Sequence, residues 1–267
     1  MENYSPIFTS TPQNTIECWK LIRNFIESWY EIDIPQIDYS EEIKYIESEL
    51  HIMLPVSFKE YIKLSKQLMS TDITHPNGYK SNNYSHIFRD IYKVERLDEH
   101  KAYSLMLQAE GDLYWAVKDE DMNFEDPPVH MYIMDYNSNI EKFNYYKQYS
   151  NNLSSFVFMH LSNFIYKTNT GGFGTTISKS DTIIQTISNY FDNSTEFGEI
   201  KIYEKENLIA LLYPDIYGDE EDEYHFSLEM WKGLNVDSIP NQILELTKHG
   251  GNFHGVFIDY INRRKKE

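Results

Sequence analysis

Hydrophobic residues recur at helical spacing in the first part of the chain, after an N-terminal segment (residues 1–13) that has the character of a loose arm. From Asn14 the apolar positions follow steps of three and four residues, which predicts an amphipathic helix. Its buried face would carry Ile16, Trp19, Ile22, Ile26 and Trp29. A second helix is expected from Ser40, because two glutamates follow it at the positive end of the helix dipole. Its inward face would carry Ile43, Ile46 and Leu50.

A third helix is expected directly after the Leu54-Pro55 pair. Pro55 favours an extended conformation for the residue before it, so the helix would begin beyond the proline. Ser57 and Glu60 have the spacing of a capping box, in which each side chain satisfies the backbone amide of the other residue.

The middle of the chain has the pattern of strands. Leu105–Ala109 and Leu113–Val117 flank a Glu-Gly-Asp turn, which predicts a hairpin. Val129–Met134 follows two prolines and is expected to be a further strand with those prolines at its leading edge. A long helix is predicted over Ser154–Tyr166. The buried core of this half would include Leu54, Phe58, Tyr61, Trp115, Val117 and Val129.

The C-terminal part has a less regular pattern. Thr168–Gly174 contains the only glycine-rich stretch of the chain and is interpreted as a flexible connection. The segments predicted after it are a helix over 181–191, strands over 200–203, 208–213 and 224–230, and a helix over 238–249.

This mixture of hairpins and helices predicts an α+β fold, with a mainly antiparallel sheet flanked by helices and a mixed C-terminal extension. The expected organisation is an N-terminal arm and helix over 1–37 and an α+β domain over 38–175. Residues 176–267 would form either an extension of that domain or a second small domain.

The net charge of the chain indicates which classes of binding partner are plausible. The chain has 267 residues, of which 42 are acidic and 24 basic, so the net charge is −18. Because phosphate contacts dominate nucleic-acid affinity, and anionic membranes also attract cations, neither is an expected partner. A basic protein is the more plausible partner, with attraction acting mainly on the association rate, unless the acidity serves only solubility. No apolar stretch is long enough to span a membrane.

The sequence offers little catalytic chemistry. The glycine-rich stretch lacks the lysine of a phosphate-binding loop, no HExxH spacing occurs, and no Gly-x-Ser-x-Gly elbow is present. The single Cys18 lies among apolar helix positions and is interpreted as a packed residue. We therefore expect no enzyme activity, no cofactor, no metal and a monomer. One cysteine and a polar N-terminus indicate the cytoplasm.

Two acidic segments are the candidate partner-binding sites. Their carboxylates belong either to solvated loops or to a surface that meets a Lys/Arg-rich partner. The candidate residues are Asp119, Glu120, Asp121, Glu125, Asp126, Asp219, Glu220, Glu221, Asp222 and Glu223. Neither segment has the alternate ligands and central glycine of an EF-hand loop. Aromatic anchors nearby would be Tyr114, Trp115, Phe124, Tyr217 and Tyr224.

The order of several motifs over residues 38–168 resembles the SUKH superfamily. The motifs are a helix leading into Leu54-Pro55 and Phe58-x-x-Tyr61-Ile62, a strand bearing Tyr114-Trp115-Ala116-Val117, the turn Asp126-Pro127-Pro128-Val129, and a late helix from Ser155 to Phe164. The resemblance implies a single α+β domain. It also implies a cytoplasmic immunity protein that neutralises a bacterial toxin, often a nuclease, by stoichiometric binding. The alternative, from other members of the family, is a non-catalytic scaffolding module in cell-wall or signalling regulation.

Overall fold

The structure is a computed structural model, which describes residues 5–30, 32–69, 96–107, 113–135, 142–164, 171–178, 181–191, 193–205, 208–214, 223–230, 241 and 252–255. The helix predicted over 238–249 lies outside these residues except for Asn241.

Five helices and eleven strands are assigned among the described residues, together with two short 3-10 turns. The helices are α1 (Thr15–Tyr30), α2 (Ser40–Leu50), α3 (Val56–Met69), α5 (Leu153–Phe164) and α6 (Asp181–Tyr190), and the 3-10 turns are η1 (Asp98–His100) and η2 (Asp119–Asp121). The strands are β1 (Arg96–Leu97), β2 (Ala102–Leu107), β3 (Leu113–Lys118), β4 (Val129–Met134), β5 (Phe143–Ser150), β6 (Gly171–Ser178), β7 (Asn193–Phe197), β8 (Ile200–Lys205), β9 (Leu208–Pro214), β10 (Glu223–Met230) and β11 (Asn252–Gly255).

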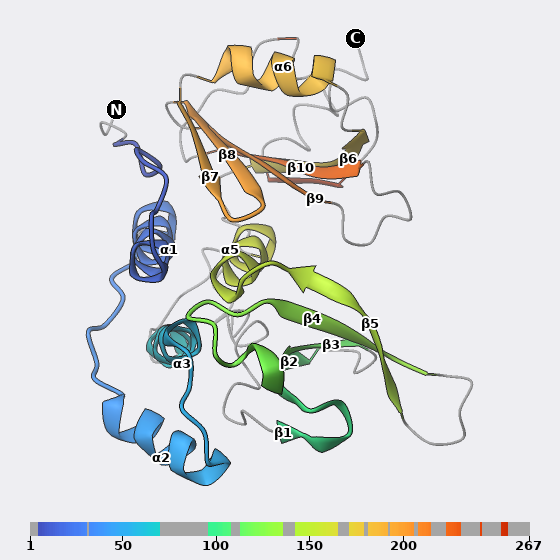
Figure 1. Ribbon diagram of the computed structural model, residues 1–267. Coiled ribbons are helices and arrows are strands. Elements are labelled where there is room, and N and C mark those ends of the chain that lie inside the picture. The colour runs from blue at the N-terminus through green and yellow to red at the C-terminus, as the bar shows by residue number, and fades with distance from the viewer. Residues whose placement is uncertain are drawn as a thin grey trace.

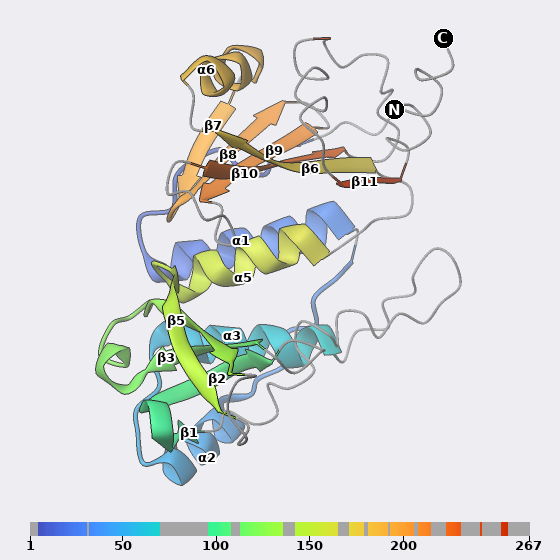
Figure 2. The same ribbon diagram turned by 90° about the vertical axis from the view of Figure 1, so that its right-hand side faces the viewer.

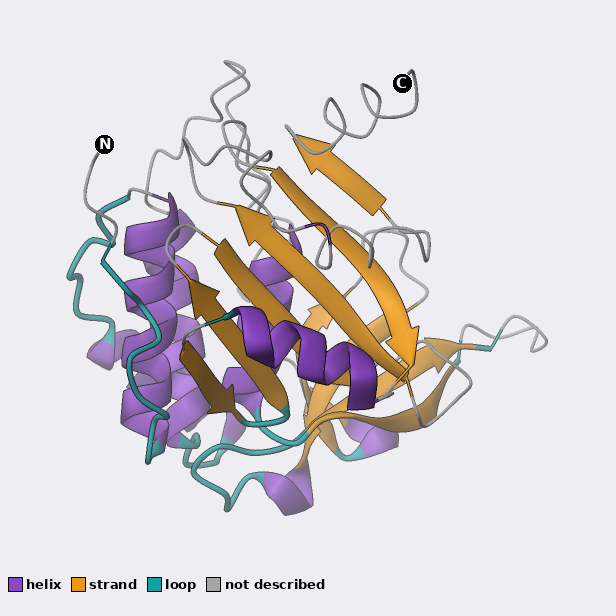
Figure 3. Ribbon diagram, turned by 90° about the horizontal axis from the view of Figure 1, so that it is seen from above, coloured by secondary structure: helices purple, strands orange, loops and turns teal. Residues whose placement is uncertain are grey.

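The strands form two antiparallel sheets with a layer of helices between them. One sheet has five strands in the order β1-β2-β3-β4-β5, and the other has six in the order β11-β6-β10-β9-β8-β7. Helices α1 and α5 run side by side between the sheets, whereas α6 lies on the far side of the six-stranded sheet (Figures 1 and 2). Seen from above, α6 crosses the strands of that sheet (Figure 3). The predicted α+β class, with mainly antiparallel sheet flanked by helices, is confirmed.

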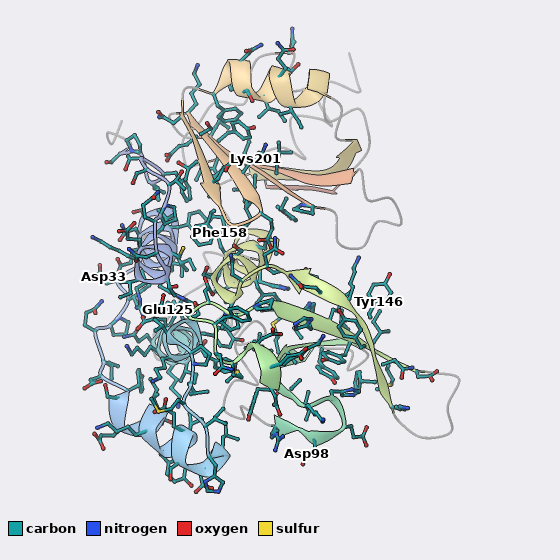
Figure 4. The ribbon with its side chains drawn as sticks, viewed as in Figure 1. Asp33, Asp98, Glu125, Tyr146, Phe158 and Lys201 are labelled. Carbon is teal, nitrogen blue, oxygen red and sulfur yellow. The ribbon has the colours of Figure 1, made fainter. Side chains whose placement is uncertain are left out.

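The two sheets share one hydrophobic core. Side chains alternate between the faces of a strand, so Ile200 and Ile202 of β8 face the helical layer while Tyr203 faces α6, where its ring lies 6.0 Å from that of Phe191. In the helical layer, Phe158 of α5 contacts the rings of Phe8, Phe25 and Phe197 at 5.1–5.8 Å (Figure 4). The six residues predicted to be core, from Leu54 to Val129, are all buried.

All strands before α5 belong to the five-stranded sheet, and all strands after it belong to the six-stranded sheet, beginning with β6. The boundary expected at residues 175/176 lies inside β6, which pairs with β10 and β11 of the second sheet. The turn between β7 and β8 fits closely on α5. Gly198 has a φ of +58° there, and an added Cβ would collide with Oγ of Ser155.

Two predictions about individual residues of the first helices were wrong. Ile16, expected on the buried face of α1, is 69% exposed. Ser57 lies inside α3, and its hydroxyl bonds to Asp126 and Trp19 rather than to Glu60 in a capping box. The helix therefore receives its N-terminal partners from a distant part of the chain.

The glycine-rich stretch was predicted to be a flexible connection, and this prediction was also wrong. Its last four residues, Gly171–Gly174, are the first half of β6. Here β10 on one side and β11 on the other pair with the glycine backbone. Paired neighbours on both sides outweigh the low strand propensity of glycine.

The N-terminal arm is fixed, not loose, around Ile7 and Phe8. The backbone N–H groups of these two residues donate to the carboxylate of Glu204 in β8, at 2.8 and 2.9 Å. Thr195 in β7 donates to the carbonyl of Phe8 at 3.3 Å, and Phe8 is buried in the shared core. The arm therefore connects the start of the chain to the six-stranded sheet.

Candidate functional site

The acidic turn, residues 119–126, connects β3 to β4 and is divided into two halves with different surroundings. Its first half is η2, in which Glu120 is exposed and the other two carboxylates are half-buried. Asp119 forms an ion pair with Arg96 at 2.8 Å, and Asp121 accepts a hydrogen bond from Nε2 of His130 at 2.8 Å. These three predicted site residues therefore lie together at the end of the five-stranded sheet.

The second half of the acidic turn forms hydrogen bonds with the N-terminal ends of two helices. Asp126 accepts hydrogen bonds from the Ser57 hydroxyl at 2.6 Å and from the Ser154 amide and hydroxyl at 3.0 and 2.6 Å. The indole of Trp19 donates to the same Ser57 hydroxyl at 2.8 Å. One carboxylate thus satisfies the N-terminal ends of α3 and α5 and is joined to α1 through Trp19. Both of its oxygens are engaged within the chain.

Glu125, the neighbour of Asp126, has an exposed side chain that lies close to α1 and α3 (Figure 4). Its carboxylate accepts from the hydroxyl of Thr15 at 3.4 Å, and its carbonyl accepts from the Ser57 amide at 3.0 Å. Asp126 and Glu125 therefore face a different part of the molecule from Asp119–Asp121.

An aromatic cluster covers the face of the five-stranded sheet that points away from α5. Trp115 contacts Phe156 and His160 of α5, so its neighbours in β3 face the opposite side. We name this surface the tyrosine face, and it consists of His100, Tyr114, Lys118, His130, Tyr132, Phe143 and Tyr145.

Strand register brings these rings together. Tyr114 in β3 is directly opposite Tyr132 in β4, and Tyr132 is opposite Tyr145 in β5. The rings of Tyr114 and Tyr132 are stacked at 4.8 Å with an interplanar angle of 7°, and Tyr145 meets Tyr132 edge-on at 5.6 Å. Tyr114 and Tyr132 are buried, whereas Tyr145 is 49% exposed. Cross-strand aromatic pairs of this kind stabilise a sheet and leave one ring available at its edge.

The carboxylates of η2 act electrostatically on this cluster. Burial, with the neighbouring Tyr145, Asp121 and Glu120, raises the pKa of Tyr132 to about 12. Burial lowers the pKa of His130 despite its bond to Asp121, so the ring is neutral near pH 7. The tyrosine face therefore has a neutral aromatic interior and an acidic end, and its own cation is Lys118.

Two polar atoms inside the cluster have no hydrogen-bond partner among the described residues. They are the hydroxyl of Tyr114 and Nδ1 of His130, both buried. Buried polar groups without a partner lower the stability of the fold. Because His130 Nδ1 is buried and Nε2 is bonded to Asp121, the ring presents no free nitrogen to a substrate arriving from solvent.

The remaining residues predicted to bind a partner lie in other parts of the chain. Asp219, Glu220, Glu221 and Asp222 lie outside the described residues, as does Tyr217, and Glu223 begins β10, where it pairs with Ser178. Tyr224 pairs with Ile177 in the same strand. Among the suggested anchors, Trp115 is a core residue, and Phe124 is 57% exposed in the acidic turn.

The surroundings of Cys18 disfavour ionisation of its thiol. Burial and the nearby Asp126 raise the pKa of the Cys18 thiol to about 11, so little thiolate forms near neutral pH. In the described part of the chain, no three His, Cys, Asp or Glu side chains are placed to hold a metal ion.

The sequence prediction missed most of the tyrosine face. It named Tyr114 but none of its partners, because Phe143 and Tyr145 lie in β5, which was not predicted, and because the register that pairs Tyr132 of the predicted β4 with Tyr114 was not known. The available signal was the alternation of His130 with Tyr132 and of Phe143 with Tyr145, which places each pair on one face of a strand.

Comparisons with known proteins returned nothing: no family model matches the chain, and no match was found among curated proteins or solved structures. Within the described residues, no helix has both the length and the apolar character needed to cross a membrane.

Proposed function

We propose that this protein is an immunity protein of the SUKH type, which binds a basic bacterial toxin one to one in the cytoplasm and neutralises it without catalysis. The contact surface would be the tyrosine face together with Asp119, Glu120 and Asp121. The observation that supports this choice most directly is the position of three carboxylates at the end of an aromatic cluster with one exposed ring, Tyr145.

The proposal assigns different tasks to the two kinds of side chain. A net charge of −18 attracts a basic protein over a distance of about 10 Å or less at ordinary salt, which raises the association rate. Aromatic rings supply contact area with few rotatable bonds, and interfaces are enriched in them for this reason. A toxin that acts on nucleic acid has a basic cleft for phosphates, which an acidic aromatic surface can cover.

The order of motifs adds a second line of support. The segments that resemble the SUKH superfamily form α3, β3, the acidic turn and α5, and Asp126 of this turn binds the first turns of α3 and α5. In this arrangement, the Asp-Pro-Pro turn fixes the helices on one side and presents Asp119–Asp121 on the other.

Growth rescue tests the function. The product of the gene adjacent to that of this protein should arrest growth when expressed alone in a bacterial cytoplasm, and co-expression of this protein should restore growth. The two proteins should co-purify in equal amounts. Absence of rescue, or rescue without a stoichiometric complex, would contradict the proposal.

A matched pair of charge reversals tests the surface. Glu120 lies beside the tyrosine face, and Glu49→Lys changes another exposed glutamate, in α2, by the same charge. Glu120→Lys should weaken rescue, whereas Glu49→Lys should leave it unchanged. Equal effects of the two variants would mean that overall charge alone acts and that the surface lies elsewhere.

A further inference from the structure

Tyr145 already holds a cation on its ring. The ammonium Nζ of Lys118 lies 4.4 Å from the centre of this ring, within the range of a cation–π contact. Lys118 is half-buried, and Tyr145 is 49% exposed. The chain therefore uses its own lysine to occupy a position on an accessible aromatic ring.

The surroundings of this ring favour a positive charge. Tyr132 meets Tyr145 edge-on at 5.6 Å, and the ring of His130 lies 5.9 Å away and is neutral near pH 7. Glu120 and Asp121 lie close enough to act on the hydroxyl of Tyr132. A cation placed at Tyr145 would thus have aromatic rings beside it and carboxylates within reach.

A second lysine–tyrosine pair in the same strand provides an internal comparison. Lys147 lies over the ring of Tyr146 at 5.2 Å, and Tyr146 is 51% exposed at the outer edge of β5 (Figure 4). Tyr146 sits at an irregularity in the pairing of β4 with β5 and contacts no other ring among the described residues. It therefore has nearly the same exposure and the same kind of lysine as Tyr145, but no aromatic neighbour in the described part of the chain.

We infer that the ring of Tyr145 is the docking place for an arginine side chain of the partner, which replaces Lys118 in the complex. Arginine fits better than lysine because its planar guanidinium stacks on an aromatic ring, is weakly hydrated and can donate to carboxylates at the same time. Lys118 would then protect the ring in the free protein and move aside on binding. This inference rests on the proposed function for the identity of the partner, but its chemistry can be tested without the toxin.

A titration with a small peptide tests the inference. The probe is a capped pentapeptide with a central arginine flanked by glycines, and the control peptide carries neutral citrulline in place of arginine. Ring signals of Tyr132 and Tyr145 are followed by NMR. The arginine peptide should shift these signals saturably, and the citrulline peptide should leave them unchanged.

Matched variants locate the site. Tyr145→Leu should abolish the shift of the Tyr132 ring, whereas Tyr146→Leu should preserve it. Lys118→Met should tighten binding of the arginine peptide by about two- to fivefold, since the internal competitor for the ring is gone. Lys147→Met changes the net charge equally and should have no effect on this titration. Thermal unfolding of each variant shows whether it is folded.

Three results would overturn the inference: equal shifts with arginine and citrulline, equal tightening by Lys118→Met and Lys147→Met, or equal loss in the two tyrosine variants. The peptide result is independent of growth rescue. A specific arginine site without rescue would contradict the immunity function alone, and rescue without an arginine site would contradict this inference alone.

Discussion

Asp126 shows how one side chain connects segments that are far apart in the sequence. Its carboxylate accepts three hydrogen bonds from the first turns of α3 and α5, and the Ser57 hydroxyl that it binds also accepts from Trp19 of α1. The positive ends of two helices meet a single negative charge there. We therefore regard Asp126 as a residue that stabilises the fold, whereas Glu120 in the first half of the acidic turn is exposed.

Replacing Asp126 should therefore reduce stability strongly. Asp126→Ala removes acceptors from two helix ends and should lower the free energy of unfolding by about 3 kcal/mol. The control is Asp98→Ala, since Asp98 makes only an exposed ion pair with Arg96 and its loss should cost about 0–1 kcal/mol. Urea unfolding of both variants measures the difference. Equal stabilities would show that the Asp126 contacts contribute little.

His160 makes stability depend on pH. It lies in α5 against Trp115 and Phe156, and burial lowers its pKa to about 3, compared with about 6.5 in an unfolded chain. Below pH 6.5 the unfolded chain takes up a proton that the folded protein excludes. The stability that comes from the neutral ring is therefore complete above this pH and is lost as the pH falls toward 3.

The consequence can be measured with His160→Leu. Between pH 7 and pH 5 the parent protein should lose about 2 kcal/mol more unfolding free energy than the variant. Urea unfolding at the two pH values gives both differences. Parallel losses in parent and variant would show that His160 is not excluded from protonation in the folded state.

Several elements were predictable because their local patterns agree with their surroundings. The spacing of Trp19, Ile22 and Ile26 predicted α1, and the hairpin of β2 and β3 was predicted from the turn between them. In contrast, β5 has four exposed residues among eight and lacks a regular alternation, because its pairing with β4 is irregular at two points. A strand of this kind depends on its neighbour, so its own sequence does not predict it.

The position of the N-terminal arm also depends on a contact with a distant part of the chain. Glu204 continues the inward face of β8 after Ile200 and Ile202, is 1% exposed, and accepts from the amides of Ile7 and Phe8. Nothing in residues 1–13 alone predicts this attachment, because its acceptor lies 196 positions away from Phe8.

Removing the acceptor should release the arm. In Glu204→Ala the amides of Ile7 and Phe8 should exchange with deuterium at least about tenfold faster, because two hydrogen bonds to a charged group are lost. Glu196→Ala removes an exposed glutamate from the adjacent β7 and should leave these amides protected. Unchanged exchange in Glu204→Ala would mean that burial of Phe8 alone fixes the arm.

At the scale of the whole molecule, charge and topology decide what can be inferred about function. The sequence predicted an acidic binding protein with Asp119, Glu120 and Asp121 among its candidate contact residues, because charge is visible without a structure. It could not separate these residues from Asp126, since the division arises from the packing of three helices around one turn. It also could not assemble the tyrosine face, which requires the register of three strands.

The most direct test of the account is the salt dependence of association with the neutralised toxin, measured by stopped-flow for the parent protein, Glu120→Lys and Glu49→Lys. The association rate constant of the parent should fall about tenfold or more as the ionic strength rises from low values to above physiological salt. At low salt, Glu120→Lys should associate several times more slowly than Glu49→Lys, although the two carry the same net charge. A rate that is independent of salt, or equal rates for the two variants, would contradict binding through the acidic end of the tyrosine face.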